Sequence, residues 1–174
     1  VVNATENYVS NRFLNAVYEI TQGDKVLTKG AAGLYSVEDK KELIPDQVMP
    51  IASVTKSMTA ASILKLQDSG KLNVTDPVSK HFTKESGFWT EGNVPAWADK
   101  ITIHNLLTHT SGLPEYFMAV QINPDASHDE INKTILNFAA SKELNEKPGT
   151  KVVYTNTNYV ILGMIIEQAS GKTI

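Results

Sequence analysis

The protein has 174 residues, enough for one domain that can bury roughly 70% of the surface of its unfolded chain. Apolar residues make up 41% and charged residues 20% of the chain, as in ordinary globular proteins. The formal net charge of −3 argues against nucleic-acid binding, and the absence of cysteine excludes disulfides, thiolate metal sites and a cysteine nucleophile.

The first predicted element is a β-hairpin over residues 11–35. The segment FLNAVYEI supplies its first strand, QGD its turn and KVLTKGAAG its second strand. The polar segment VEDKKELIPDQVMP predicts a loop, with a turn signal at Pro45-Asp46. Because an isolated two-stranded hairpin is only marginally stable, we expect these strands to find further strands or to pack against helices.

A long helix is predicted next, over residues 53–69, with Gly70 just beyond its end. The apolar side chains of this helix lie on several faces: Val54, Met58, Ala60, Ala61, Ile63, Leu64 and Leu66. This distribution predicts a helix buried inside the fold rather than one that lies on the surface.

Two shorter helical segments follow. In TDPVSKHF, we expect a helix to begin with Asp76 as N-cap and Pro77 as its first residue. The segment ITIHNLLTHTSGLP predicts a short helix after Thr102 and a loop from Thr110.

Two further helices complete the predicted order. SHDEINKTILNFAA begins with a capping box formed by Ser127 and Glu130. The last helix is predicted over about residues 157–170 and ends at Gly171. The order is therefore two strands followed mostly by helices.

The motif S-x-x-K occurs twice, as Ser53 with Lys56 and as Ser62 with Lys65, where about one chance match is expected. Ser62 lies inside the predicted helix, whereas Ser53 lies at its start, where the first N–H groups lack intrahelical partners. A serine there gains an environment that stabilises an oxyanion, and Lys56 shares its helical face. The competing interpretation is an ordinary N-cap serine beside a solvated lysine.

A second motif lies in VVYTNTNY, where Tyr154 and Asn156 are two residues apart in an extended segment that leads into a helix. The alternation of side chains along extended backbone places both on the same side. A phenol and an amide carried together suit proton transfer and hydrogen bonding to a substrate. The competing interpretation makes Tyr154 a core aromatic residue and Asn156 the cap of the next helix.

Several segments, taken in order, resemble the superfamily of serine β-lactamases and penicillin-binding proteins, in the branch of class C β-lactamases, D-alanyl-D-alanine carboxypeptidases and related esterases. PDQVMPIASVTKSMTA resembles the region of the first motif, S-x-x-K, and EKPGTKVVYTNTNYVILGMIIEQASGKT that of the second, Y-x-N. KLNVTDPVSKHF and ITIHNLLTHTSGLP resemble recurrent family segments between them. The resemblance covers residues 13–173. It implies a single domain over residues 1–174 with a β-lactamase-like α+β fold, in which an antiparallel sheet packs with helices beside a helical subdomain.

The resemblance also implies a serine hydrolase that cleaves β-lactam, D-Ala-D-Ala-type peptide or ester bonds through an acyl-enzyme at Ser53. Lys56 would help to remove the proton of Ser53, whose backbone N–H would form half of the oxyanion hole. Tyr154 would be the second acid–base group, and Asn156 would hydrogen-bond the substrate amide. The main base is left open between Lys56 and Tyr154, because a protonated amine would stabilise the phenolate and the two would titrate as a pair.

The chain departs from the family pattern at its third motif, K-[ST]-G or H-x-G, which follows Y-x-N on a strand. HTSG at His109 precedes Y-x-N, and GKT at Gly171 comes in the wrong order. We therefore expect an N-terminal portion of the domain that lacks the C-terminal strands. Its unpaired strand edges would favour aggregation or pairing with another chain, such as the missing C-terminal portion. The missing motif keeps a second interpretation open, a non-catalytic penicillin-binding-like or structural binding module.

The remaining expectations concern cofactors, membranes and location. No metal or organic cofactor is implied, because the four histidines show no paired metal spacing, and we expect His109 to be a buried, hydrogen-bonded structural residue. No apolar run approaches the ~20 residues needed to cross a bilayer. The start VVNATENYV indicates a mature chain or an artificially shortened one rather than a native start, and the family resemblance implies a periplasmic or secreted protein with a small-molecule or peptide substrate.

Overall fold

The computed structural model describes residues 4, 7–9, 15–82 and 94–174. The chain divides into two compact units, Val1–Ile51 and Ala52–Ile174. That residues 1–174 make up a single domain stays a prediction.

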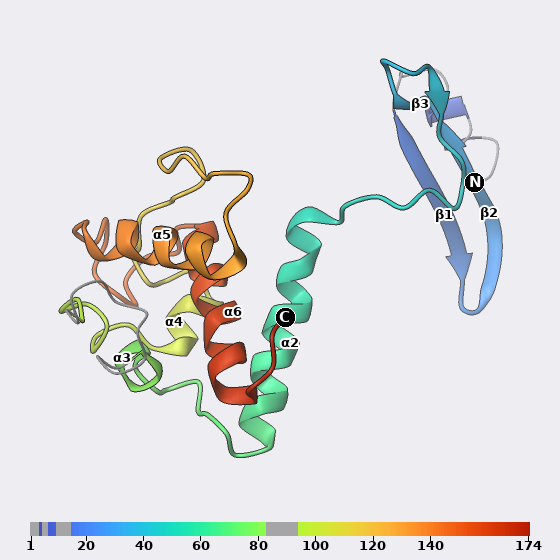
Figure 1. The fold of residues 1–174 in the computed structure, drawn as a ribbon. Helices are drawn as coiled ribbons and strands as arrows, with labels where there is room; N and C mark the ends of the chain where they lie inside the picture. The colour runs from blue at the N-terminus through green and yellow to red at the C-terminus, as the bar shows by residue number, and fades with distance from the viewer. Residues whose placement is uncertain (1–3, 5–6, 10–14, 83–93) are drawn as a thin grey trace. The chain divides into compact units, whose positions relative to one another are not determined.

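The first unit contains two small antiparallel sheets (Figure 1). β1 (Ala16–Gln22) pairs with β2 (Lys25–Ala32), and Gly23 in the connecting turn has a left-handed φ of 55° that suits glycine. β3 (Leu34–Ser36) pairs with β4 (Lys41–Glu42). The predicted hairpin is confirmed over β1 and β2, whereas its predicted residues 11–14 lie outside the described part of the chain.

The loop prediction after the hairpin is wrong at Lys41–Glu42, which forms β4. A strand of two residues is too short to leave an alternating pattern of apolar and polar residues. Both of its residues are exposed, so burial gives no signal either.

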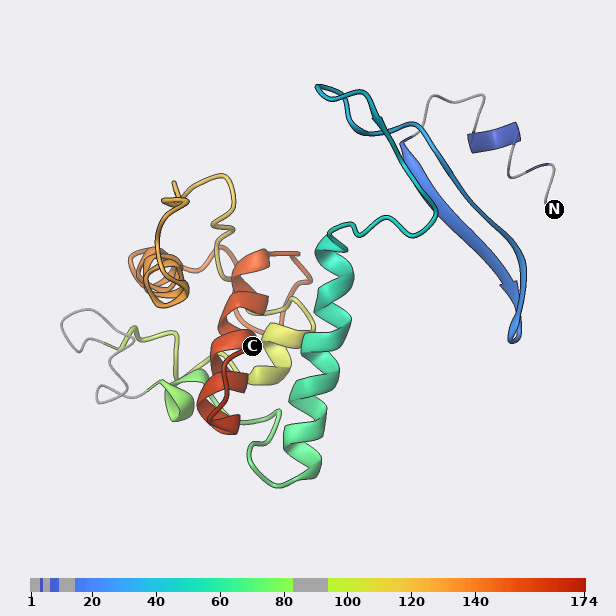
Figure 2. The same cartoon turned by 45° about the vertical axis from the view of Figure 1, so that its right-hand side comes forward.

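The second unit is built around α6 (Asn156–Ser170), which contacts α2 (Thr55–Asp68), α3 (Val78–His81), α4 (Ile103–Leu107) and α5 (His128–Ala140). Figures 1 and 2 both show α2 running alongside α6. Ile161, Met164 and Ile165 of α6 are buried. Burying a side chain of this size contributes about 1.5–3 kcal/mol, so the apolar side of α6 fixes the helix whose first residue is Asn156.

The first long helix begins later than predicted. Ser53 lies in a 3₁₀ turn, η1 (Ala52–Val54), and the α-helix starts at Thr55. Ala52 has a φ of 44°, which non-glycine residues rarely adopt, so the backbone is strained directly before Ser53. The predicted end is confirmed, because Ser69 is the C-cap and Gly70 follows with a φ of 72°.

The prediction of a buried helix is wrong for α2. Ile63 is its only buried residue, and Met58 and Leu64 are 58% and 48% exposed. Within the second unit α2 packs mainly on α6, so only one of its apolar faces is covered.

The start of α3 also differs from the prediction. Pro77 is the N-cap, and the carboxylate of Asp76 caps no helix. It accepts a hydrogen bond from the backbone N–H of Asn73 at 2.8 Å and lies 2.8 Å from the Lys80 ammonium. These contacts stabilise the turn before α3. An aspartate that stabilises a turn and one that caps a helix give the same sequence pattern, so the sequence could not separate the two roles.

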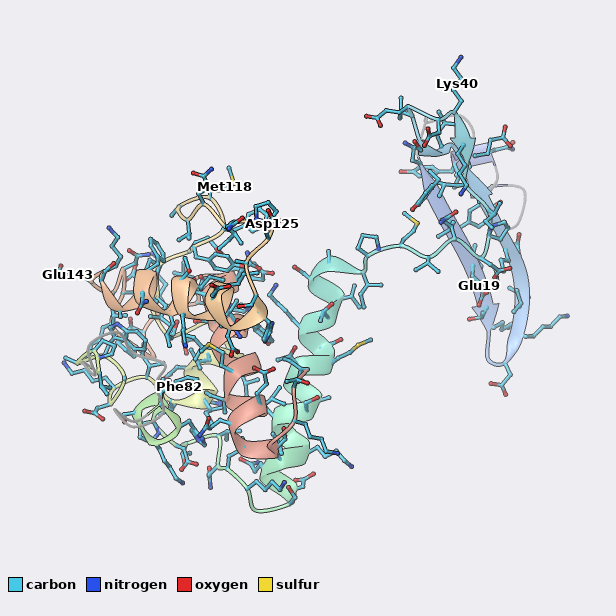
Figure 3. The ribbon with its side chains drawn as sticks, in the orientation of Figure 1. Glu19, Lys40, Phe82, Met118, Asp125 and Glu143 are labelled. Carbon is cyan, nitrogen blue, oxygen red and sulfur yellow. The ribbon has the colours of Figure 1, made fainter. Side chains whose placement is uncertain are left out.

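The predicted helix start after Thr102 and the predicted capping box of Ser127 and Glu130 are confirmed. Thr102 caps α4, and Ser127 with Glu130 forms the capping box of α5. The segment between these helices carries Met118 and Asp125, labelled in Figure 3. None of the described helices is both long and apolar enough to span a bilayer.

Candidate active site

Ser53 lies where the two sequence motifs meet. Its Oγ lies 3.0 Å from Tyr154 Oη and accepts a hydrogen bond of 3.0 Å from Lys56 Nζ. The residue is exposed, so its hydroxyl is open to a molecule from solution. The N-cap interpretation is wrong, because Val54 occupies the N-cap of α2 and no side-chain hydrogen bond caps that helix.

Lys56 connects Ser53 to the start of α6. It is half-buried, and its Nζ donates at 2.8 Å to Asn156 Oδ1 as well as to Ser53 Oγ. The ammonium group also lies 5.0 Å from the centre of the Tyr154 ring and 5.7 Å from that of Tyr159, within the range of cation–π attraction. These contacts confine the amine beside the Ser53 hydroxyl.

Tyr154 presents its hydroxyl to Ser53 from the segment before α6. Its side chain is 53% exposed, so the core-aromatic interpretation is wrong. Hydrogen bonding from Lys56, and secondly from Ser53, lowers the pKa of the phenol below its usual value of 10.0. The phenol is therefore easier to ionise than a free tyrosine, as a proton acceptor for Ser53 requires.

Asn156 is the first residue of α6, and its amide is held at both ends. Its Oδ1 accepts from Lys56 Nζ, and its Nδ2 donates to Glu115 Oε2 at 3.1 Å. The cap interpretation is wrong, because Thr155 is the N-cap of α6. An amide nitrogen carries two hydrogens, so one N–H of Asn156 remains for a substrate once Glu115 has accepted the other.

Glu115 is a site residue that the sequence patterns did not predict. Its Oε2 accepts from the backbone N–H of Asn156 at 2.7 Å as well as from the side-chain amide, and its Oε1 accepts from the Phe117 N–H at 2.9 Å. The residue lies 41 positions before Asn156, so no local spacing connects the two. The available signal was its place directly after the family-like segment ITIHNLLTHTSGLP.

His109 lies beside the phenol. The ring centres of His109 and Tyr154 are 4.5 Å apart, and His109 Nδ1 accepts hydrogen bonds from the Thr155 N–H and from Asn158 Nδ2. Burial, and secondly the charge of Lys56, lowers the pKa of His109, which favours the neutral ring. The expected hydrogen-bonded role is confirmed, although the ring is half-buried rather than buried.

The described residues contain no group of three or more His, Asp or Glu side chains that could hold a metal ion. The cluster at Ser53 brings together a hydroxyl, an amine, a phenol and an amide.

Comparison with known proteins identifies the family of the chain. A model of the Beta-lactamase family matches residues 2–174. The chain belongs to the Beta-lactamase family. Penicillin-binding protein 4* of Bacillus subtilis (strain 168) is 31% identical over 161 residues, which cover 91% of this chain and 33% of that protein. The chain thus spans about a third of the length of the curated relatives that it matches.

Solved structures of the same superfamily share the fold. The octameric penicillin-binding protein homologue from Pyrococcus abyssi is 30% identical with a TM-score of 0.72, over 99% of this chain and 40% of that chain. A D-stereospecific amidohydrolase from Streptomyces sp. is also 30% identical, with a TM-score of 0.69 over 90% of this chain and 45% of that chain. The predicted β-lactamase-like α+β fold is confirmed.

Proposed function

We propose that the protein is a serine hydrolase that forms an acyl-enzyme at Ser53 and cleaves amide or ester bonds. One observation carries the proposal: the exposed Ser53 hydroxyl lies 3.0 Å from both the Tyr154 phenol and the Lys56 amine. A serine hydroxyl becomes an effective nucleophile when a base within hydrogen-bond distance takes its proton. Two such groups converge here.

In the first step, Ser53 Oγ attacks the carbonyl carbon of the substrate while its proton passes to the Tyr154–Lys56 pair. The carbonyl oxygen takes the electron pair of its π bond and becomes an oxyanion. The backbone N–H of Ser53, at the beginning of the helical segment, is the first donor to that oxyanion. The family's third motif, for which the 174 residues have no match, is proposed to supply the second donor.

In the second step, the tetrahedral intermediate collapses and the bond to the leaving nitrogen or oxygen breaks. The leaving group takes the proton held by Tyr154 and Lys56, and the acyl group stays on Ser53. Water then gives a proton to the same pair and attacks the ester, and the proton returns to Ser53 Oγ as the acid product leaves. The free N–H of Asn156 is placed to bind the substrate amide.

The proposed substrates are β-lactams, peptides ending in D-Ala-D-Ala, and esters. Similarity to a penicillin-binding protein and to a D-stereospecific amidohydrolase, each at about 30% identity, supports the β-lactam and amide substrates in this range. All three substrate types present a carbonyl carbon to a serine hydroxyl, which is the chemistry that the cluster can perform.

The proposal is tested on the natural full-length protein with a fluorescent penicillin and an activated ester. Intact-mass spectrometry should show one acyl group per chain, and Ser53→Ala should show none. Ser62→Ala is the matched control, because it removes a serine from the second S-x-x-K motif, and it should be acylated like the wild type. No adduct from either reagent with the wild type would favour the binding-module interpretation.

A further inference from the structure

We propose that Glu115 is a positioning residue for the acylation reaction: it fixes the orientation of the Asn156 side-chain amide, and through that amide it sets the position of Lys56 beside Ser53. The inference deepens the proposed function and rests on it. The carboxylate touches none of the groups that take part in bond making. Glu115 acts on Lys56 only through the Asn156 amide, which hydrogen-bonds to both.

The contacts of the carboxylate show that it is built in as an acceptor. Three N–H groups donate to its two oxygens: the Asn156 backbone at 2.7 Å, the Asn156 side chain at 3.1 Å and the Phe117 backbone at 2.9 Å. Glu115 is half-buried, and one of these donors is the first N–H of α6. A negative charge is favoured there, because the N-terminal N–H groups of a 15-residue helix carry partial positive charge.

The backbone that carries Glu115 is held against the same helix start. The carbonyl oxygen of Pro114 accepts from Thr157 Oγ1 at 2.6 Å and from Thr155 Oγ1 at 3.3 Å. Four positions before Glu115, the buried Ser111 donates to Asn158 Oδ1 at 2.6 Å. The segment before Glu115 is therefore hydrogen-bonded to residues on both sides of Asn156, which holds the carboxylate in a fixed position.

The orientation of the amide has a chemical consequence. With Nδ2 toward Glu115, Oδ1 faces Lys56 Nζ at 2.8 Å and accepts one of its hydrogens. The flipped amide would place two donors together at Lys56 and two acceptors together at Glu115. Glu115 thereby removes the flipped state, and the amine stays within 3.0 Å of Ser53 Oγ.

The charge of Glu115 should affect the pKa of Tyr154, which a purely structural contact would not change. The charged or titratable groups around the Tyr154 phenol are Lys56 of α2, Tyr159 of α6, and His109 and Glu115 of the intervening segment. Glu115 acts on the Tyr154 pKa in the direction opposite to Lys56 and raises it. Neutralising Glu115 should therefore lower the pKa of the phenol further.

Three substitutions separate reach from charge. Glu115→Asp keeps the charge but shortens the side chain, Glu115→Gln keeps the length but removes the charge, and Glu115→Ala removes both. Glu143→Gln is the matched control for the change in net charge, since Glu143 is exposed and lies beyond the end of α5 (Figure 3). Acylation by a fluorescent penicillin is followed against pH in the natural full-length protein, and the Tyr154 pKa is measured by NMR of ¹³C-labelled tyrosine.

We expect Glu115→Asp and Glu115→Ala to slow acylation on the order of 10- to 100-fold, as displaced catalytic groups do. Glu115→Gln should slow it less and should shift the rise of rate with pH, and the Tyr154 titration, to lower pH. Glu143→Gln should match the wild type. If Glu115→Ala does not fold, Glu115→Gln and the titration decide.

The outcomes separate the two proposals. Wild-type rates and an unmoved Tyr154 titration in the Glu115 variants, with Ser53→Ala inactive, would overturn the role of Glu115 and leave the serine hydrolase standing. A wild type that is never acylated would overturn the hydrolase. In that case, the titration of Tyr154 in Glu115→Gln still decides whether Glu115 acts on the cluster.

Discussion

One helical segment carries Ser53 at its start and Ser62 in its middle, and the surroundings of these two serines differ. At its start, the hydroxyl of Ser53 contacts the amine of Lys56 and the phenol of Tyr154. In the middle of α2, the hydroxyl of Ser62 donates at 2.9 Å to the carbonyl oxygen of Met58 in the preceding turn. Both serines precede a lysine by three residues. The spacing is the same, but the Ser53 hydroxyl contacts a residue from another part of the chain, whereas the Ser62 hydroxyl bonds within its own helix.

The two regions also differ in burial. Ser53 and Ser62 are both exposed, but Val54, next to Ser53, is also exposed, whereas Ile63, next to Ser62, is fully buried against the core of the second unit. The start of the segment thus offers reactive groups to solution, and the middle anchors the helix. The same sequence motif lies in the proposed active site at one place and beside a packing contact at the other.

Removing the nucleophile should have the largest effect. Ser53→Ala should reduce acylation by a loss on the order of 10⁶-fold, because it removes the hydroxyl that attacks the substrate. The measurement is the rate of adduct formation with an activated ester by intact mass. If Ser53→Ala is still acylated at a rate within about 10-fold of the wild-type rate, Ser53 is not the nucleophile.

Removing the amine should have the next largest effect. Lys56→Met should slow acylation on the order of 10²- to 10⁴-fold, the usual contribution of a general acid–base group. Lys65→Met, at the equivalent place in the second motif, should leave the rate unchanged. Equal losses of rate in Lys56→Met and Lys65→Met would show that Lys56 has no specific role in acylation.

Shortening the buried side chain in the middle of α2 should affect stability and spare the chemistry. Ile63→Ala should lower the free energy of unfolding by about 2–5 kcal/mol, because it leaves a cavity at a fully buried site. Leu64→Ala, 48% exposed before substitution, should cost less than about 1 kcal/mol. Urea unfolding measures both, and the folded fraction of Ile63→Ala should still be acylated at Ser53.

The pH dependence provides a smaller effect. Lys56 and Ser53 lower the pKa of Tyr154, so the phenolate, and with it the acylation rate, increases as pH rises through that lowered pKa and is lost as pH falls below it. In Lys56→Met the main cause of the shift is gone, and Tyr154 should titrate closer to 10.0. NMR of labelled tyrosine measures this directly. A Tyr154 titration that stays in place would show that the amine does not act on the phenol.

Local patterns predicted the parts of the site that local spacing determines. A few neighbouring residues define each of the two pairs, Ser53 with Lys56 and Tyr154 with Asn156. The family resemblance predicted that the two pairs belong to one site. Glu115 and His109 were not predicted as members of the site, because their contacts cross 41 to 49 positions of the chain and leave no periodic signal.

The fold was predictable to a similar extent and for the same reason. Capping boxes such as Thr102 with Asn105 and Ser127 with Glu130 mark helix starts through neighbouring residues. The 3₁₀ turn at Ser53 and the exposed faces of α2 depend on what each segment contacts, which composition alone does not give. Propensity therefore identified the helices, and tertiary contacts decided their ends and their burial.

The most direct test maps the acyl group on the wild-type chain. The natural full-length protein is incubated with a fluorescent penicillin, digested and sequenced by tandem mass spectrometry. We predict a single modified residue, Ser53, with Ser62 of α2 unmodified. An adduct on any other residue, with Ser53 free, would contradict the account.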